Sequence, residues 1–87
     1  LAGAKRARVF RAQRLLAALG YYAGPVDGRL DPATRRSMRS FERDFNLPVL
    51  GRLTRKLMMT LIRERRRRSV TASARLERWE GGLGHDE

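Results

Sequence analysis

The sequence predicts an all-α fold: a small three-helix bundle with two ordered loops and a basic, partly flexible C-terminal extension. Apolar side chains recur at helical spacing in three stretches of the chain. Short segments rich in turn-forming residues separate these stretches and are typical of tight, structured connections. With 87 residues, the chain is the size of one small domain, which buries only about 60% of the surface that the unfolded chain exposes.

The first helix is predicted over residues 6–19, because apolar residues there lie three or four positions apart along one face. Gly20 is suited to cap its C-terminus. Gln13 is the one uncharged polar residue within this helix, and we expect its amide to hydrogen-bond into the loop that follows.

Residues 19–34 are predicted to form a structured loop that leads into the second helix. The backbone path is set by glycines that permit positive φ and by a proline that fixes φ: Gly20, Gly24, Gly28 and Pro25. Asp31 can accept hydrogen bonds from the N–H groups of a first helical turn, and Pro32 loses no hydrogen bond at the first helical position. The loop therefore ends at the start of a helix.

The second helix is predicted over residues 32–45 and the third over 54–66, with an ordered loop at 47–53 between them. Asn46 tolerates the left-handed conformation that ends the second helix, and Thr54 can cap the third. The predicted core consists of Val9, Leu16, Leu19, Tyr21, Val26, Leu30, Met38, Phe41, Phe45, Leu50, Leu53, Leu57 and Leu61.

We predict one domain at residues 5–66 and a basic, flexible tail at residues 67–87. Like charges crowd together in the run of arginines that closes the third helix, and we expect the helix to fray there. The spacing of apolar residues admits a short helix around residues 70–80. Within it, Trp79 either docks on the bundle, which we favour, or marks a contact with whatever follows in a longer parent protein. The glycine-rich last residues predict fast motion.

The chain is strongly basic. Twenty Lys and Arg residues, eighteen of them arginine, stand against nine Asp and Glu, for a formal net charge of +11. Such a chain should bind polyanions: nucleic acid, anionic lipid, an anionic cell-wall polymer or an acidic partner protein. No apolar run approaches the roughly 20 residues of a membrane-spanning helix, so no membrane span is predicted.

Catalytic and metal chemistry are not predicted. The chain has no cysteine, and its single histidine, His85, lies in the predicted tail without a second group to orient it. Asp27 and Asp31 are better explained as acceptors for loop and helix N–H groups than as an acid/base pair. We therefore expect no enzyme activity, no metal ion and no cofactor.

A spaced pattern of residues resembles the peptidoglycan-binding-domain-like family. Its most specific part is Leu-Gly-Tyr-Tyr-x-Gly-x-Val-Asp-Gly at residues 19–28, followed by Pro32-x-Thr34 and by Phe41. Family members commonly have Phe-Gln where this chain has Phe41-Glu42. The resemblance implies a bacterial, non-catalytic three-helix binding module that anchors a larger protein to peptidoglycan in the cell envelope, periplasmic or extracellular, with a fused catalytic domain as a candidate neighbour.

The candidate binding face lies where the first loop meets the start of the second helix. Unpaired backbone N–H groups, a pair of tyrosines and several arginines can converge there on a carboxylate of a peptidoglycan stem peptide. An aromatic ring can also cover the apolar face of a sugar, and we expect one tyrosine to be mostly buried and the other available. The candidate ligand-binding residues are Tyr21, Tyr22, Asp27, Gly28, Arg29, Arg35, Arg36 and Arg39.

Two other functions remain open at this point. The bundle can present the arginines of the second helix and the run at residues 63–68 to the backbone of a nucleic acid or to anionic lipid. No recognition-helix motif supports specific DNA binding, so nucleic acid is the weaker candidate. The chain can also dock through its arginine-rich surface on an acidic partner protein.

Overall fold

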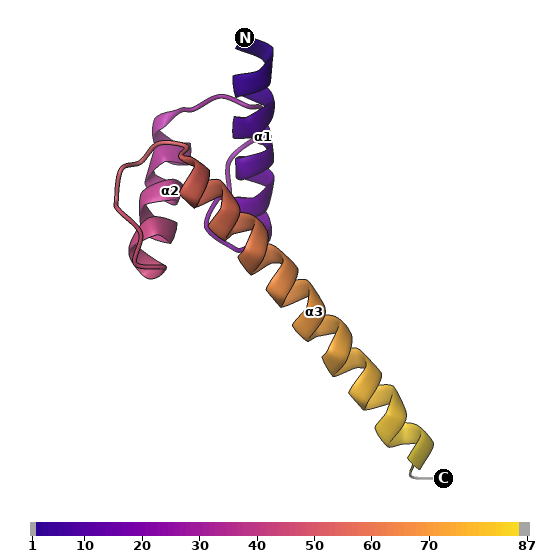
Figure 1. Cartoon of the computed structure of the whole chain (residues 1–87). Coiled ribbons are helices and arrows are strands. Elements are labelled where there is room, and N and C mark those ends of the chain that lie inside the picture. Colours follow the sequence, from indigo (N-terminus) through magenta and orange to yellow (C-terminus); the bar gives the residue numbers. More distant parts are fainter. Residues whose placement is uncertain (1, 86–87) are drawn as a thin grey trace.

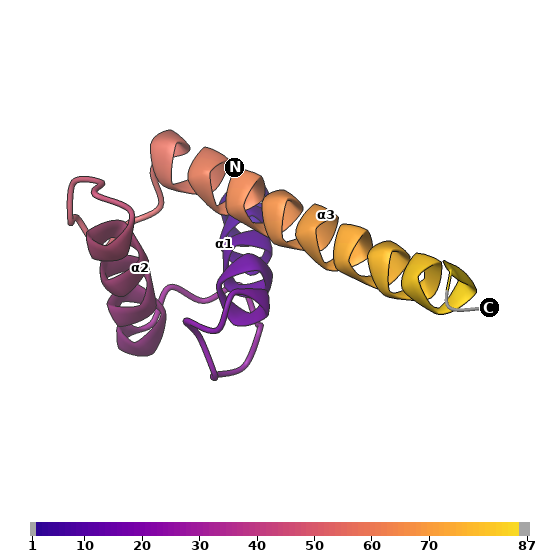
Figure 2. The same cartoon turned by 90° about the horizontal axis from the view of Figure 1, so that it is seen from below.

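The computed structural model describes residues 2–85, with side chains described for residues 3–70. This part of the chain contains three helices and no strand: α1 (Ala2–Ala18), α2 (Pro32–Asp44) and α3 (Arg55–His85). α1 packs against both other helices, while α3 crosses the bundle and continues beyond it (Figures 1 and 2). The predicted all-α three-helix bundle is confirmed.

The first two helices end in the same hydrogen-bonded motif. After α1, Gly20 has φ 87° and its N–H donates to Ala17, while the N–H of Tyr21 donates to the carbonyl of Leu16 at 2.8 Å. This pair of bonds is a Schellman motif, in which a left-handed residue lets two carbonyls of the last turn find partners. At the end of α2, Asn46 takes the equivalent position with φ 60°. Both predicted helix stops are confirmed.

The starts of α2 and α3 also follow the sequence prediction. Asp31 has an extended backbone, and its carboxylate accepts from the N–H of Thr34 at 2.9 Å, with Pro32 beginning the helix. Thr54 accepts from the N–H of Leu57 at 3.1 Å through its hydroxyl. Each cap satisfies a donor that the first helical turn cannot pair internally.

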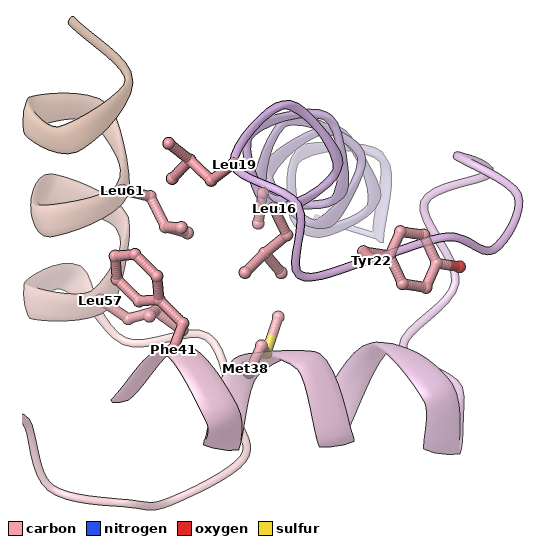
Figure 3. Packing of buried hydrophobic residues seen from close by; sticks show 8 residues of the cluster. Leu16, Leu19, Tyr22, Met38, Phe41, Leu57 and Leu61 are labelled. Carbon is pink, nitrogen blue, oxygen red and sulfur yellow. The ribbon is translucent and has the colours of Figure 1, made fainter. Parts of the chain in front are cut away.

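The core lies where the three helices meet (Figure 3). Phe41 is fully buried, stacks on Phe45 with ring centroids 4.3 Å apart, and meets the ring of Tyr21 edge to face at 5.3 Å. The buried apolar residues are Val9, Ala12, Leu16, Leu19, Tyr22, Met38, Phe41, Leu57 and Leu61, and further predicted members pack against them partly buried: Tyr21, Val26, Leu30, Phe45 and Leu53.

Three residues differ from the predicted core: Leu50 is exposed, and Tyr22 and Ala12 are buried. Leu50 is 47% exposed, because the second loop turns its backbone N–H inward, where it donates to Glu42 at 3.0 Å. Tyr22, absent from the predicted core, is buried at 6% exposure.

The predicted end of the third helix near residue 66 is wrong, because α3 runs without a break to His85. The guanidinium group of Arg68 donates to the carbonyl of Leu19 at 3.3 Å, so the helix is still held by α1 after the expected end. Glu64 is buried and lies 3.7 Å from Arg67 one turn on, which offsets part of the repulsion within the arginine run. No glycine or proline interrupts the chain between Thr54 and Glu80.

Some expectations fall outside the described residues. The side chain of Trp79 is outside the described part, and so are Asp86 and Glu87. Docking of the tryptophan and fast motion of the last residues therefore stay predictions. Within residues 2–85, none of the helices combines the length and apolar character needed to cross a bilayer.

Replacing Phe41 by alanine should lower the free energy of unfolding by about 3–5 kcal/mol, since a fully buried ring leaves a cavity at the contact of all three helices. Chemical denaturation measures this loss. The matched control is Phe10→Ala, whose ring is 42% exposed and whose loss should change stability little. Equal effects of the two substitutions would show that the core is centred elsewhere.

Candidate functional site

The amide of Gln13 holds the first loop in place. This side chain is fully buried, and its oxygen accepts from the N–H groups of Asp27 at 3.0 Å and Gly28 at 2.8 Å. Its nitrogen donates to the carbonyl of Arg29 and to the hydroxyl of Thr34, both at 2.9 Å. Two backbone donors on one side and two acceptors on the other fix the orientation of the amide. The predicted hydrogen bonding of Gln13 into the loop is confirmed.

The same network reaches the start of α2. Because Gln13 donates to the Thr34 hydroxyl, the proton of that hydroxyl points to Asp31, whose oxygen lies 2.6 Å away. The carboxylate of Asp31 also accepts from the Thr34 N–H. A chain of hydrogen bonds thus runs from α1 through the loop to the cap of α2.

Gly28 lies at the tightest point of the loop. Its φ is 79°, and a Cβ atom built there would lie 2.6 Å from the side chain and 2.9 Å from the carbonyl oxygen of Arg6. Arg6 in turn donates to the carbonyl of Asp27 at 3.2 Å. Only glycine fits both the left-handed backbone and the contact with α1.

Three backbone donors around Gly28 and one at the helix start are not free to meet a ligand, contrary to the premise of the sequence prediction for these groups. The N–H groups of Asp27 and Gly28 bind Gln13, and that of Arg29 donates to the Asp27 carboxylate at 2.9 Å. At the helix start, the Thr34 N–H is taken by the Asp31 cap. A ligand at this loop therefore meets side chains, because the inner donors already have partners.

The tyrosines have different environments. Tyr22 is buried, and its hydroxyl donates to the carbonyl of Pro25 at 2.7 Å. Tyr21 is partly exposed, and its hydroxyl donates to Asp44 at 2.6 Å, at the C-terminal end of α2. Burial first, and then the hydrogen bond to Asp44, raise the pKa of Tyr21 to about 12.

The four candidate arginines fall into two groups. Arg29 and Arg36 are exposed, Arg29 in the first loop and Arg36 within α2. Arg35 donates to the carbonyl of Gly51 at 3.2 Å, and the side chain of Arg39 passes so close to Gly51 that a Cβ there would lie 2.6 Å from it. Arg35 therefore holds the second loop by a hydrogen bond, and Arg39, which is itself exposed, packs against Gly51.

The candidate residues do not converge on one small site. Tyr21 contacts Asp44 at one end of α2, whereas the first loop meets the other end at Asp31. The 13 residues of α2 separate these ends by about 20 Å. Exposed arginines at the first loop include Arg29, Arg36 and also Arg6 of α1, which donates to the carbonyl of Asp27.

Glu42 holds the second loop as Gln13 holds the first, and the sequence analysis did not assign it this role. Its side chain is 1% exposed, and one carboxylate oxygen accepts from the N–H groups of Leu50 and Gly51, each at 3.0 Å. The other oxygen is buried without a partner among the described residues. The sequence signal was the resemblance, in which this position commonly carries an amide.

The carboxylates near the first loop act as hydrogen-bond acceptors. No group of three or more His, Cys, Asp or Glu side chains in the described part of the chain is arranged to hold a metal ion. Asp31 caps a helix, and the hydrogen bonds from the Thr34 hydroxyl and then the Thr34 N–H lower the pKa of its carboxyl. A carboxyl with a lowered pKa at pH 7 is a charged acceptor and a poor general acid.

Replacing Gln13 by alanine should lower the free energy of unfolding by roughly 3 kcal/mol or more, because two N–H groups and two oxygens lose partners and each unmet buried group costs about 1–3 kcal/mol. Chemical denaturation measures the loss. Arg14→Ala is the control, since this neighbouring side chain is exposed. A loss no larger than in the control would contradict the role of the Gln13 amide.

The lowered pKa of Asp31 makes stability depend on pH. The folded state binds this proton less readily than the unfolded state, whose carboxyl has its ordinary value of 3.8, so the stabilisation is present above pH 3.8 and is lost as pH falls through the lower folded value. Asp31→Asn keeps a cap acceptor but does not titrate, so its unfolding free energy should fall less steeply in acid. Denaturant titrations at several pH values in this range measure the unfolding free energy of both proteins. The same dependence on pH in Asp31→Asn and in the parent would contradict the role of the Asp31 carboxyl.

Comparison with known proteins gives partial relatives and a family. The chain is 42% identical over 52 residues to the "Putative OxPP cycle protein OpcA" of Nostoc punctiforme, and 50% identical over 40 residues to the "Localization factor PodJL" of Caulobacter vibrioides. These alignments cover 60% and 46% of this chain but only 11% and 4% of the relatives. No solved structure matches the chain significantly.

The family match covers the bundle that these hydrogen bonds organise. Residues 5–61 match the family described as "Putative peptidoglycan binding domain". The matched stretch contains Gln13, the first loop and Glu42, and it includes α1 from Lys5, all of α2 and the first turns of α3. Since the match spans well over half of the chain, this protein belongs to the peptidoglycan binding domain family.

Proposed function

We propose that this domain is a non-catalytic module that anchors a larger envelope protein to peptidoglycan. Family membership supports a peptidoglycan-binding module associated with the cell envelope. The chain spans only a small part of the length of its relatives. We propose that the module is joined to a larger protein, with a catalytic domain as one candidate, and that it acts in the periplasm or outside the cell.

The observation that carries the proposal is the rigid first loop, which presents Arg29 beside the start of α2. Its backbone is fixed by the hydrogen bonds to Gln13, so Arg29 is displayed from a position that needs no ordering on binding. Arg36 is exposed on the helix that the loop begins. Peptidoglycan stem peptides carry carboxylates, which guanidinium groups bind through two parallel hydrogen bonds.

Of the other candidate residues, Tyr21 is the one aromatic side chain of the pair with exposed surface for a sugar ring. The Tyr21 hydroxyl lies at Asp44, at the opposite end of α2 from Asp31. Such separate contact points suit a polymer that touches the surface at several places. Asp27, Gly28 and Tyr22 support the loop from within. Arg35 and Arg39 serve the second loop in the same way.

The test is cosedimentation of the domain with purified peptidoglycan sacculi. The double substitution Arg29→Ala with Arg36→Ala should weaken binding at least about tenfold, equivalent to 1.4 kcal/mol, because the proposed carboxylate contacts are lost. The matched control is Arg43→Ala with Arg52→Ala, which removes the same charge from exposed positions elsewhere. The control should bind nearly as the parent does.

Equal losses in the two double variants would mean that net charge, and not the loop, drives binding. No binding of the parent to sacculi at physiological salt would overturn the proposal. Circular dichroism of each variant checks that the fold is kept. All four arginine side chains are exposed. Arg29 meets Gln13 only through its backbone carbonyl, which the substitution keeps.

A further inference from the structure

A groove between α1 and α3 is lined by four arginines from two helices. Arg11 and Arg14 come from α1, and Arg65 and Arg66 from α3, around a cavity of about 540 Å³. All four side chains are exposed, and no ion pair joins any of them to a carboxylate among the side chains that the structure describes. No acidic residue lines the cavity. The groove therefore concentrates positive charge that no carboxylate among the described side chains neutralises.

The floor of the same groove is apolar. Leu15 of α1 and Ile62 of α3 are partly buried there, and Val70 is 62% exposed at the far end of the α3 side. An exposed β-branched side chain beside arginines offers apolar area to a partner. The groove thus combines a strip for apolar contacts with a rim for anions.

The length of the groove along α3 is that of a short helical segment. The lining of α3 extends from Ile62 to Val70, which is about 12 Å of helix, or roughly two turns. An amphipathic helix laid between α1 and α3 would place apolar side chains three or four positions apart on the floor. Its acidic side chains, on either side of that stripe, would lie beside the arginines.

From these observations we propose that the α1/α3 groove docks an acidic amphipathic helix of a partner protein. Carboxylates pair with guanidinium groups through two hydrogen bonds, and the apolar stripe covers Leu15, Ile62 and Val70. The site is separate from the first loop, because neither Arg29 nor Arg36 lines it. The domain would then contact peptidoglycan and a protein through different surfaces.

Other polyanions fit this groove less well. No aromatic side chain lines it, so bases of a single strand have nothing to stack on, and a phosphate backbone leaves the apolar floor uncovered. A membrane surface presents its charges on a broad plane, whereas these arginines surround a hollow between two helices. Both alternatives are included in the test below.

The experiment measures binding of a labelled synthetic peptide to the whole chain by fluorescence anisotropy. The peptide is about 15 residues of leucine and glutamate, with leucines at helical spacing on one face. The comparison peptide has the same composition in an order without helical period. The helical peptide should bind at least tenfold more tightly than the scrambled one. Any binding of duplex DNA or phosphatidylserine vesicles should be the same in the parent and in the groove variants.

Two groove variants test the site, Arg11→Gln with Arg66→Gln for the rim and Val70→Ser for the floor. Both change exposed side chains, so the fold should be kept. The arginine variant should weaken peptide binding at least tenfold and the Val70 variant about threefold. The charge-matched control, Arg8→Gln with Arg55→Gln, changes exposed arginines outside the groove and should bind almost as the parent does.

Equal binding of the helical and scrambled peptides, or equal losses in the groove and control variants, would overturn the proposal. So would DNA or vesicle binding that depends on the groove arginines while the helical peptide fails to bind. Sacculus binding should be unchanged in the groove variants. If the parent fails to bind sacculi but binds the helical peptide through the groove arginines, the peptidoglycan proposal fails and the groove proposal stands. If the parent binds sacculi through Arg29 and Arg36 but does not bind the helical peptide, the groove proposal fails and the peptidoglycan proposal stands.

Discussion

The structure depends on one buried amide. Gln13 is surrounded by α1, the first loop and the start of α2, and each of its polar atoms has at least two partners there. A leucine of similar volume would fill the space but leave the loop backbone unsatisfied, and a charged side chain would supply only one type of partner. The amide is the side chain that accepts from two N–H groups and donates to two oxygens at once. The part of the loop around Gly28 can therefore be buried against α1 with its N–H groups paired.

The second loop uses the same principle with a poorer match. Glu42 gives one oxygen to Leu50 and Gly51, as Gln13 does to its loop, but its second oxygen faces the interior without a donor. Burial of an unpaired carboxylate oxygen is costly. The nearby guanidinium groups are occupied with Gly51, where Arg35 donates to the carbonyl and Arg39 covers the glycine. The two loops are thus built alike, and the second holds the weaker set of hydrogen bonds.

Most of the fold could be predicted because local chemistry determines it. Asp31, Asn46 and Thr54 act through hydrogen bonds within one helical turn, and Gln13 was recognisable as a lone amide in a charged and apolar helix. The features that the sequence did not predict depend on contacts between residues that are not neighbours in the chain. Where α3 passes residue 66, Arg68 meets the end of α1, and the exposure of Leu50 follows from a buried glutamate eight residues earlier. The arginine groove depends on the packing of two helices, which no spacing along the chain reveals.

The hydrogen bonds of Gln13 also determine how the first loop moves. The amide protons of Asp27 and Gly28 point at a fully buried side chain of α1, so they reach water only when the loop separates from Gln13. That separation leaves the buried oxygen of Gln13 without its two donors, which costs free energy. Opening of the loop is therefore disfavoured. Amide exchange at these two positions should be slower than at loop positions without such partners, and a ligand meets the loop mainly in this one conformation.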